Sequence, residues 1–414
     1  MKRKKWMAFC LSALLLTGCG NTVSAKISAG SGETASTAEP VRPEDDFVKA
    51  AADFAAVTAS KVLSEAVPGQ NYLYSPASLY LALAMTADTA SGETQQQMLS
   101  LLGAEDADSL REDASNWYQY LCSGEEGTVE IAGSLWLNEG IPFHQEALDR
   151  LADSYDAYAY QMDFTSASLP KEVAAWVREA THGLLGDASD FQPEPDSALF
   201  LLSTLYFKGA WSSPFSEDDT ETGDFIASNG TVLSIPFMQK SAQTAYVDGG
   251  NFAAASLSMQ NGAVMTFILP DEGVSPAEVA ADSDALFAAY FPENSEYGKV
   301  NFRVPKFDYS ASVETLPEIL QTLGMTDAFD GEQADFSILS SEPLFISNIR
   351  QEATLSIDEE GCEGAAYTQV SMNATAAMPP EQEFTLNLDR PFLFAVRYRD
   401  TILFTGIVEN PSAS

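Results

Sequence analysis

Residues 357–380 read IDEEGCEGAAYTQVSMNATAAMPP and separate two segments that have the hydrophobic pattern of β-strands. Between Gly361 and Val370 no aliphatic side chain larger than that of alanine occurs. A connection longer than about 15 residues without structure of its own is usually functional or disordered. We interpret the segment as a strand that is held outside its sheet and can join it later.

The side chains of this segment separate by size when residues 361–375 are drawn as a strand, because successive side chains point to opposite faces. The small set fits beneath a packed layer, whereas the other set includes charged, amide and aromatic side chains that can remain in water. The small set is Cys362, Gly364, Ala366, Thr368 and Val370, and the other is Glu363, Ala365, Tyr367, Gln369 and Ser371. A permanently solvated loop is the alternative, because small residues are common in loops.

The rest of the chain predicts one mixed domain over residues 44–411, with a short tail at 412–414. Ser75 before Pro76 is a typical helix start, and the apolar residues 76–90 predict a buried helix. Residues 94–97 fit a capping box, Gly103 fits a helix end, and helical spacing returns at 312–325. Strand patterns occupy 197–211, 264–270, 300–307, 344–360, 384–388, 392–398 and 402–410. This order predicts an α+β fold with large sheets.

Acidic residues outnumber basic ones by 60 to 21, so the formal net charge is −39. This excess disfavours nucleic acid, heparin-like polyanions and anionic lipid as direct partners. A cationic protein is the partner that such a surface favours, although solubility alone is the simpler interpretation.

The N-terminus has the pattern of an export signal. Residues 2–5 are basic and residues 6–16 are apolar but too few to span a membrane, which predicts a signal peptide over residues 1–18. The sequence LTGC at 16–19 is typical of a bacterial lipoprotein with Cys19 as the lipidated residue, and ordinary signal cleavage is the alternative. Residues 19–43 predict a flexible tether. We therefore expect an exported protein, anchored to a membrane at the cell surface or secreted.

The few cysteines and histidines limit the chemistry of this chain. Two of its four cysteines lie in the export region, so only Cys122 and Cys362 remain in the body, and a bond between them stays open. His144 and His182 lie in no metal-binding pattern, and no GxSxG, Walker or dinucleotide motif occurs. We expect no enzyme activity, no cofactor and no metal site.

Five segments carry a resemblance that covers nearly all of residues 45–411. They are YLYSPASLYLALAMTADTASGETQQQMLSLLG (72–103), STLYFKGAW (203–211), VPKFDYSASVETLPEILQTLGMTDAFDGEQADFS (304–337), EEGCEGAAY (359–367) and DRPFLFAVRYRDTILFTGIVENP (389–411). In this order they resemble the serpins, a family of serine protease inhibitors. The resemblance implies the serpin fold, with three β-sheets, about nine helices and an exposed reactive-centre loop at about 359–383.

The resemblance also implies roles for individual residues. A hinge, where strand insertion begins, falls at Glu359, Glu360, Gly361, Cys362, Glu363, Gly364, Ala365 and Ala366, and Gly361 can absorb a large change of φ and ψ there. Trp211 corresponds to a tryptophan at the top of the main sheet, with a plain core aromatic as the alternative. A polar cluster beneath the sheet opening corresponds to Ser75, Ser78, Ser203 and Gln351. Cys362 and Tyr367 depart from the family pattern, and Tyr367 is expected to slow insertion.

The same resemblance places the scissile bond between Thr375 and Ala376, or between Ala376 and Ala377 when the count starts from the prolines at 379–380. The residue before the cut is then small and uncharged, and residues 361–380 contain no Lys or Arg. An elastase-like or subtilisin-like pocket fits this loop better than a trypsin-like one, while the target protease stays open.

The implied function is suicide-substrate inhibition of a serine protease, in which the acyl-enzyme is trapped when the cut loop enters the main sheet. The partner is a serine protease, a cationic host protease in one hypothesis, and the inhibitor is expected to be a monomer. The rival interpretation is a non-inhibitory serpin that acts as a binding or scaffold protein.

Overall fold

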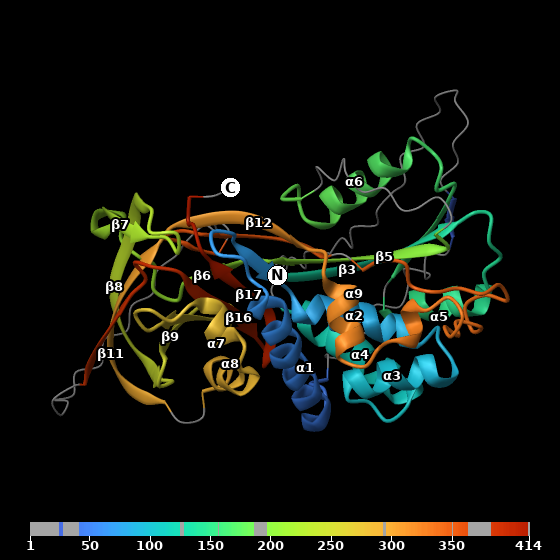
Figure 1. Cartoon of the computed structure of the whole chain (residues 1–414), viewed down its shortest axis with the longest axis horizontal. Helices are drawn as coiled ribbons and strands as arrows, with labels where there is room; N and C mark the ends of the chain where they lie inside the picture. The colour runs from blue at the N-terminus through green and yellow to red at the C-terminus, as the bar shows by residue number, and fades with distance from the viewer. Residues whose placement is uncertain are drawn as a thin grey trace, which may run out of the picture.

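The structure is a computed structural model of the chain, and it describes residues 25–27, 41–124, 128–155, 157–185, 197–292, 295–349, 351–362 and 382–412. Within these ranges, nine α-helices and three β-sheets form an α+β fold (Figure 1). The predicted fold class is therefore confirmed.

The helices lie mostly in the N-terminal half of the chain. They are α1 (Asp45–Ser64), α2 (Pro76–Ala87), α3 (Gly92–Leu102), α4 (Ala107–Cys122), α5 (Gln145–Tyr155), α6 (Leu169–Ala180), α7 (Pro276–Ala280), α8 (Ser283–Tyr290) and α9 (Leu316–Thr322), with 3-10 turns η1 (Glu217–Asp219) and η2 (Asp327–Phe329). Ser75 caps α2 as predicted, because its side chain accepts a hydrogen bond from the Ser78 amide. No helix in the described part of the chain combines the length and apolarity that crossing a membrane requires.

The largest sheet has nine strands and forms the core of one side of the molecule (Figure 1). Its order is β15 (Glu383–Asn387), β11 (Glu296–Pro305), β8 (Val232–Asp248), β9 (Phe252–Ser258), β10 (Val264–Pro270), β16 (Phe392–Tyr398), β17 (Thr401–Val408) and β2 (Tyr72–Tyr74), with β7 (Glu221–Ile226) paired to β8. The predicted hairpin turn at Arg399 and Asp400 is confirmed, and both residues have positive φ. Every residue of β17 is buried, so this strand lies at the centre of the core.

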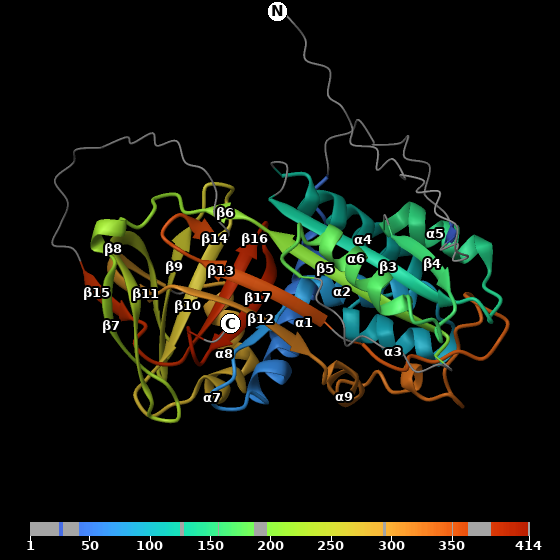
Figure 2. The same ribbon diagram turned by 90° about the horizontal axis from the view of Figure 1, so that it is seen from above.

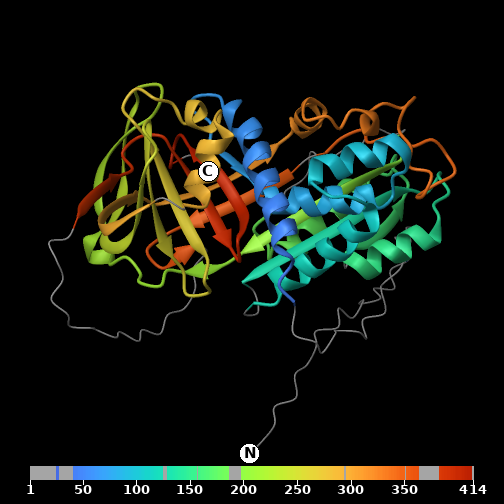
Figure 3. The same ribbon diagram turned by 90° about the horizontal axis from the view of Figure 1, so that it is seen from below.

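The other two sheets have four strands each, and one continues where the other ends. One has the order β1 (Ala25–Ile27), β4 (Tyr158–Met162), β3 (Val129–Asn138) and β5 (Leu199–Phe207), and the other has the order β12 (Phe307–Val313), β13 (Gln351–Ile357), β14 (Gly361–Cys362) and β6 (Gly209–Ala210). Only Lys208 separates β5 from β6 in the chain, so the two sheets are parts of one interrupted layer (Figure 2). The helix α6 covers one face of this layer, and α2, α4 and α5 lie on the other (Figures 1 and 3).

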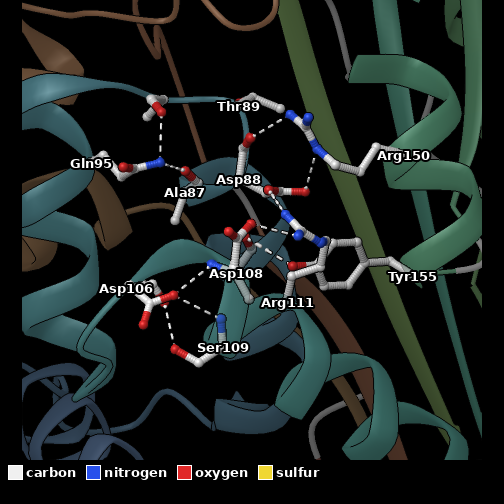
Figure 4. A network of polar contacts seen from close by, with 12 residues as sticks. Ala87, Asp88, Thr89, Gln95, Asp106, Asp108, Ser109, Arg111, Arg150 and Tyr155 are labelled. Carbon is white, nitrogen blue, oxygen red and sulfur yellow. Dashed lines mark hydrogen bonds and ion pairs between the residues drawn. The ribbon is translucent and has the colours of Figure 1, made fainter. Parts of the chain in front are cut away.

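A buried ion cluster holds the C-terminal end of α2 beneath this layer (Figure 4). The Asp88 carboxylate accepts hydrogen bonds from Arg111 of α4 at 2.7 Å and from Arg150 of α5 at 3.1 Å. Burial raises the pKa of Asp88, and the two guanidinium groups oppose that rise. A carboxylate is unfavourable at a helix C-terminus, so the two arginines compensate it and join α2 to α4 and α5.

Some predicted element bounds are wrong. The segment 344–360 forms a strand only over β13, because its neighbour β12 ends at Val313, opposite Gln351, and gives residues 344–349 no strand to pair with. The segment 312–325 is helical only in α9, since its first two residues belong to β12. The helix α3 starts after Ser91 rather than at the predicted capping box, and the Thr94 hydroxyl instead accepts a hydrogen bond from the Asp335 amide. Gly103 ends α3 with a φ of 69°, as predicted.

Candidate functional site

The candidate site is the gap between β5 and β13 in the interrupted layer. The two strands run in the same direction, because β6 continues the path of β5 and both β6 and β13 pair antiparallel with β14. β5 pairs with β3, and β13 pairs with β12 and, at Ile357, with β14; within the described residues no backbone pairing joins β5 to β13. Each strand therefore presents an unused hydrogen-bonding edge to the other, which is the geometry that accepts an added strand.

One end of the gap is already occupied by the two-residue strand β14. Gly361 lies opposite Ala210, and Cys362 lies opposite both Gly209 and Ile357. Cys362 is 1 % exposed, so its side chain faces the core. Cys122 and Cys362 are both thiols in this structure, so the pairing that the sequence left open is not made.

Gly361 is required by a close approach of two backbones. A Cβ atom at this position would lie 2.2 Å from the Gly209 carbonyl oxygen and 2.8 Å from the Ala210 Cα. Its φ is not in the left-handed region, which distinguishes it from the turn glycines of this chain. The freedom of φ and ψ that the sequence led us to expect at Gly361 stays a prediction. The structure supplies a separate, steric reason for a glycine at this position.

The turn that joins β13 to β14 is bound to the segment that follows β6. Trp211 is 1 % exposed, and its indole donates to the Asp358 carbonyl at 2.9 Å. The Trp211 amide donates to the Glu360 carbonyl and the Phe215 amide to the Glu359 carbonyl, both at 2.9 Å. Trp211 is therefore buried and also holds the turn between β13 and β14, while its role at a hinge stays a prediction.

Glu359 is the buried charge of the hinge. Its carboxylate accepts hydrogen bonds from Lys306 Nζ at 2.6 Å and from the Thr220 hydroxyl at 2.8 Å, and the residue is 8 % exposed. Burial acts to raise the pKa of Glu359, but the hydrogen bonds from Lys306 and Thr220 outweigh it and hold the pKa below its ordinary value. The Glu359 carboxylate thus joins the turn to Lys306, which lies between β11 and β12, and to Thr220, which directly precedes β7.

A polar cluster connects both edges of the gap with α2. The Gln351 side chain of β13 accepts from the Ser75 amide at 2.6 Å and donates to the Ser75 carbonyl at 2.9 Å. The Ser78 hydroxyl donates to the Ser203 hydroxyl of β5 at 2.7 Å. Ser75, Ser78 and Gln351 are buried, so these bonds form in a water-poor environment beneath the gap.

An apolar pocket lies at the far end of the gap, away from β14. It is lined by Leu199 of β5, by Leu344 and Ile346 ahead of β13, and by Met85 and Leu135 from the underlying elements. The gap therefore has a polar middle and an apolar end.

The structure gathers the residues predicted from the sequence into two groups. Trp211 lies with residues 359–362 at one end of the gap, and Ser75, Ser78, Ser203 and Gln351 lie together at its middle. The hinge positions Glu363, Gly364, Ala365 and Ala366, the bond positions Thr375, Ala376 and Ala377, and the lipidation position Cys19 lie outside the described residues. Sequence reasoning missed Asp358, Thr220 and Lys306, although an Asp three residues before a Gly is a turn signal.

Comparison with known proteins supports one family across almost the whole chain. The family model described as Serpin (serine protease inhibitor) matches residues 49–411. A serpin-like protein of Thermococcus kodakarensis is 31% identical over 350 residues, which cover 82% of this chain and 81% of that protein.

Solved structures agree with this result. The native state of tengpin, a thermophilic serpin, has a TM-score of 0.78 at 28% identity and covers 90% of this chain and 96% of its own. Human thyroxine-binding globulin, complexed with thyroxine, has a TM-score of 0.78 at 25% identity and covers 89% of this chain and 99% of its own. With a family match from residue 49 to residue 411 and the fold in common, this chain belongs to the serpins, a family of serine protease inhibitors.

Proposed function

We propose that this protein inhibits serine proteases irreversibly by inserting its cleaved reactive-centre loop between β5 and β13. The observation that carries the proposal is the gap itself, which has two unused strand edges and β14 already placed at one end. The protease serine attacks a loop carbonyl and forms an acyl-enzyme as the peptide bond breaks. The hinge side of the loop then extends β14 along the gap and carries the attached protease with it.

The register of β14 supports this proposal. When the pairings of Cys362 with Gly209 and Ile357 are continued without a bulge, Thr368 comes opposite Ser203 of β5 and Gln351 of β13. A hydroxyl would then enter the polar cluster, where it can both donate and accept hydrogen bonds. Gly364 and Ala366 would face the same way, over the buried side chains of β13, so the small set of the loop meets the core.

The free energy of insertion is large enough for such a trap. A new central strand of this length gains roughly 15 backbone hydrogen bonds, each with a net contribution of about 0.5–1.5 kcal/mol. The sum is on the order of 10–20 kcal/mol, whereas a protease is stable by about 5–15 kcal/mol. Insertion can therefore compete with the ordered active site of the trapped enzyme.

The loop composition favours proteases that accept a small residue before the cut, elastase-like or subtilisin-like enzymes. Residues 361–380 offer no Lys or Arg to a trypsin-like pocket. The bond between Thr375 and Ala376 is the first candidate and the bond between Ala376 and Ala377 the second. The net charge of −39 would steer a cationic protease to the inhibitor, with an association rate that falls as salt rises.

A single incubation tests the inhibitory function. The protein is mixed with a pancreatic elastase and, in parallel, with trypsin, and each mixture is analysed on a denaturing gel and by intact mass. We expect a covalent complex with the elastase and a C-terminal fragment that starts at Ala376 or Ala377. Cleavage without any complex would instead favour a non-inhibitory binding protein, and thyroxine-binding globulin is a structural relative that binds a small molecule.

The proposal includes export and lipid anchoring through Cys19, in the manner of a bacterial lipoprotein. The basic and apolar residues before LTGC support it. Expression of the full chain in a bacterium should yield a membrane-bound form whose N-terminal mass includes lipid. A Cys19→Ser variant recovered in the same fraction with the same mass increment would contradict this assignment.

A further inference from the structure

The Asp358 carboxylate closes the turn between β13 and β14 from the inside. Its Oδ1 accepts a hydrogen bond from the Glu360 amide at 2.9 Å and one from the Gly361 amide at 3.0 Å. The Asp358 amide donates in turn to the Gly361 carbonyl at 3.0 Å. Three hydrogen bonds therefore determine the path of four residues, and two of them end on one ionisable side chain.

These bonds act differently from the contacts that surround the turn. Trp211, Phe215, Thr220 and Lys306 bind the turn from outside and determine where it lies in the molecule. The Asp358 carboxylate instead determines how many residues the turn contains, because it binds the amides of the two residues before Cys362, which is the residue of β14 that pairs with β13. The number of residues in a turn sets the register of the strand that follows it.

Register matters here more than in an ordinary hairpin. Cys362 lies opposite Ile357 and Gly209 and faces the core, and a shift by one residue would turn every following side chain to the other face. Glu363 would then be directed into the core, where a carboxylate without a partner is costly. Gly361, whose backbone approaches Gly209, would leave the position where no Cβ fits.

We propose that Asp358 is a positioning residue for strand insertion, which holds β14 in register before the loop is cut so that insertion starts from a preformed end. This role rests on the proposed function, since it concerns the same gap. Asp358 does not touch the protease or the reacting bond. It acts through the backbone of Glu360 and Gly361.

Two measurements on Asp358→Ala and Asp358→Asn test this role. The first is the rate at which an alkylating reagent labels Cys362, followed peptide by peptide in the mass spectrometer, because the buried thiol reacts only when β14 leaves the sheet. The second is the number of inhibitor molecules consumed for each elastase molecule trapped. Asp282→Ala is the matched control, since the Asp282 carboxylate also accepts from two amides, at 3.0 and 3.1 Å, at the start of α8.

Asp358→Ala should raise the Cys362 labelling rate about tenfold or more, because two hydrogen bonds to a charged group are lost. It should also consume more inhibitor per trapped protease, as loops that start out of register are released as cleaved product. Asp358→Asn should behave like the wild type, since its amide oxygen can accept the same bonds. Asp282→Ala should leave both values unchanged, even if it lowers the unfolding temperature.

Wild-type values for Asp358→Ala in both measurements would overturn the positioning role while leaving the inhibitory function intact. A wild-type protein that traps no protease would instead reject the proposed function. In that case the Cys362 labelling rate still decides whether Asp358 holds β14 in the sheet.

Discussion

Glu359 shows how one side chain can serve both the resting fold and the proposed movement. Glu359 is buried, and its carboxylate accepts hydrogen bonds from Lys306 and Thr220. Its backbone carbonyl accepts a hydrogen bond from the Phe215 amide. All three partners lie outside the loop that the proposed movement inserts. Glu359 therefore anchors the turn ahead of β14, from which the proposed insertion would start.

Replacing Glu359 by Ala should lower the free energy of unfolding by about 2 kcal/mol, because hydrogen bonds to a charged group contribute about 1.5–3 kcal/mol and the Lys306 ammonium loses its partner. A double-mutant cycle with Lys306→Met, read from denaturant unfolding, separates this coupling from other effects. If the changes in unfolding free energy of the two single variants add up to that of the double variant, the Glu359–Lys306 contact does not contribute directly.

Protonation should weaken the same contact. The pKa of Glu359 is lowered in the folded protein from an ordinary value of 4.5. Its stabilisation is therefore complete above pH 4.5 and is lost as the pH falls through the lower folded value. The difference in unfolding free energy between the wild type and Glu359→Gln should shrink below pH 4.5; a difference independent of pH would contradict this.

Gly361 should tolerate no side chain while β14 stays in place, because a Cβ would overlap the Gly209 carbonyl. Gly361→Ala should therefore release β14 and expose Cys362 to alkylation at a higher rate than in the wild type. Gly230→Ala is a control in open space, where a positive φ causes strain without any contact. Equal Cys362 labelling in all three proteins would show that the close approach does not restrain the hinge.

The elements differ in how well the sequence predicted them. The helix α2, the end of α3 at Gly103 and the β16–β17 hairpin follow local patterns, so capping residues and alternation were sufficient. The length of β13 was not predictable, because it depends on where β12 ends in the neighbouring position. Lys306 and Thr220 were missed for the same reason, since their contact with Glu359 joins segments far apart in the chain.

The register of β14 predicts which loop positions accept a large side chain. Thr368→Arg should block insertion, because the guanidinium would enter the polar cluster at Ser203 and Gln351 without a carboxylate to receive it. Gln369→Arg changes the neighbouring residue, which would face away from the core in the inserted strand, and is the matched control. We expect the Thr368 variant to be cleaved as a substrate without trapping protease, while the Gln369 variant still forms the covalent complex. Equal trapping by both would contradict the register.

The molecule as a whole combines a firmly packed nine-stranded sheet with a layer that is incomplete. The ion cluster at Asp88 and the polar cluster at Ser75 hold the two ends of α2 beneath the incomplete layer. Helix α6 on one face of this layer and α2 on the other supply packing that an added central strand needs. The resting state therefore has a lower number of backbone hydrogen bonds than the fold can accommodate, and it is expected to be metastable.

Thermal unfolding of the intact and the nicked protein measures this metastability most directly. A metalloprotease that cuts within residues 363–381 forms no acyl-enzyme, so it produces nicked inhibitor without a trapped partner. We predict that nicking raises the unfolding midpoint by roughly 20 °C, as expected if insertion adds on the order of 10 kcal/mol. An unchanged or lower midpoint after complete cleavage would contradict it.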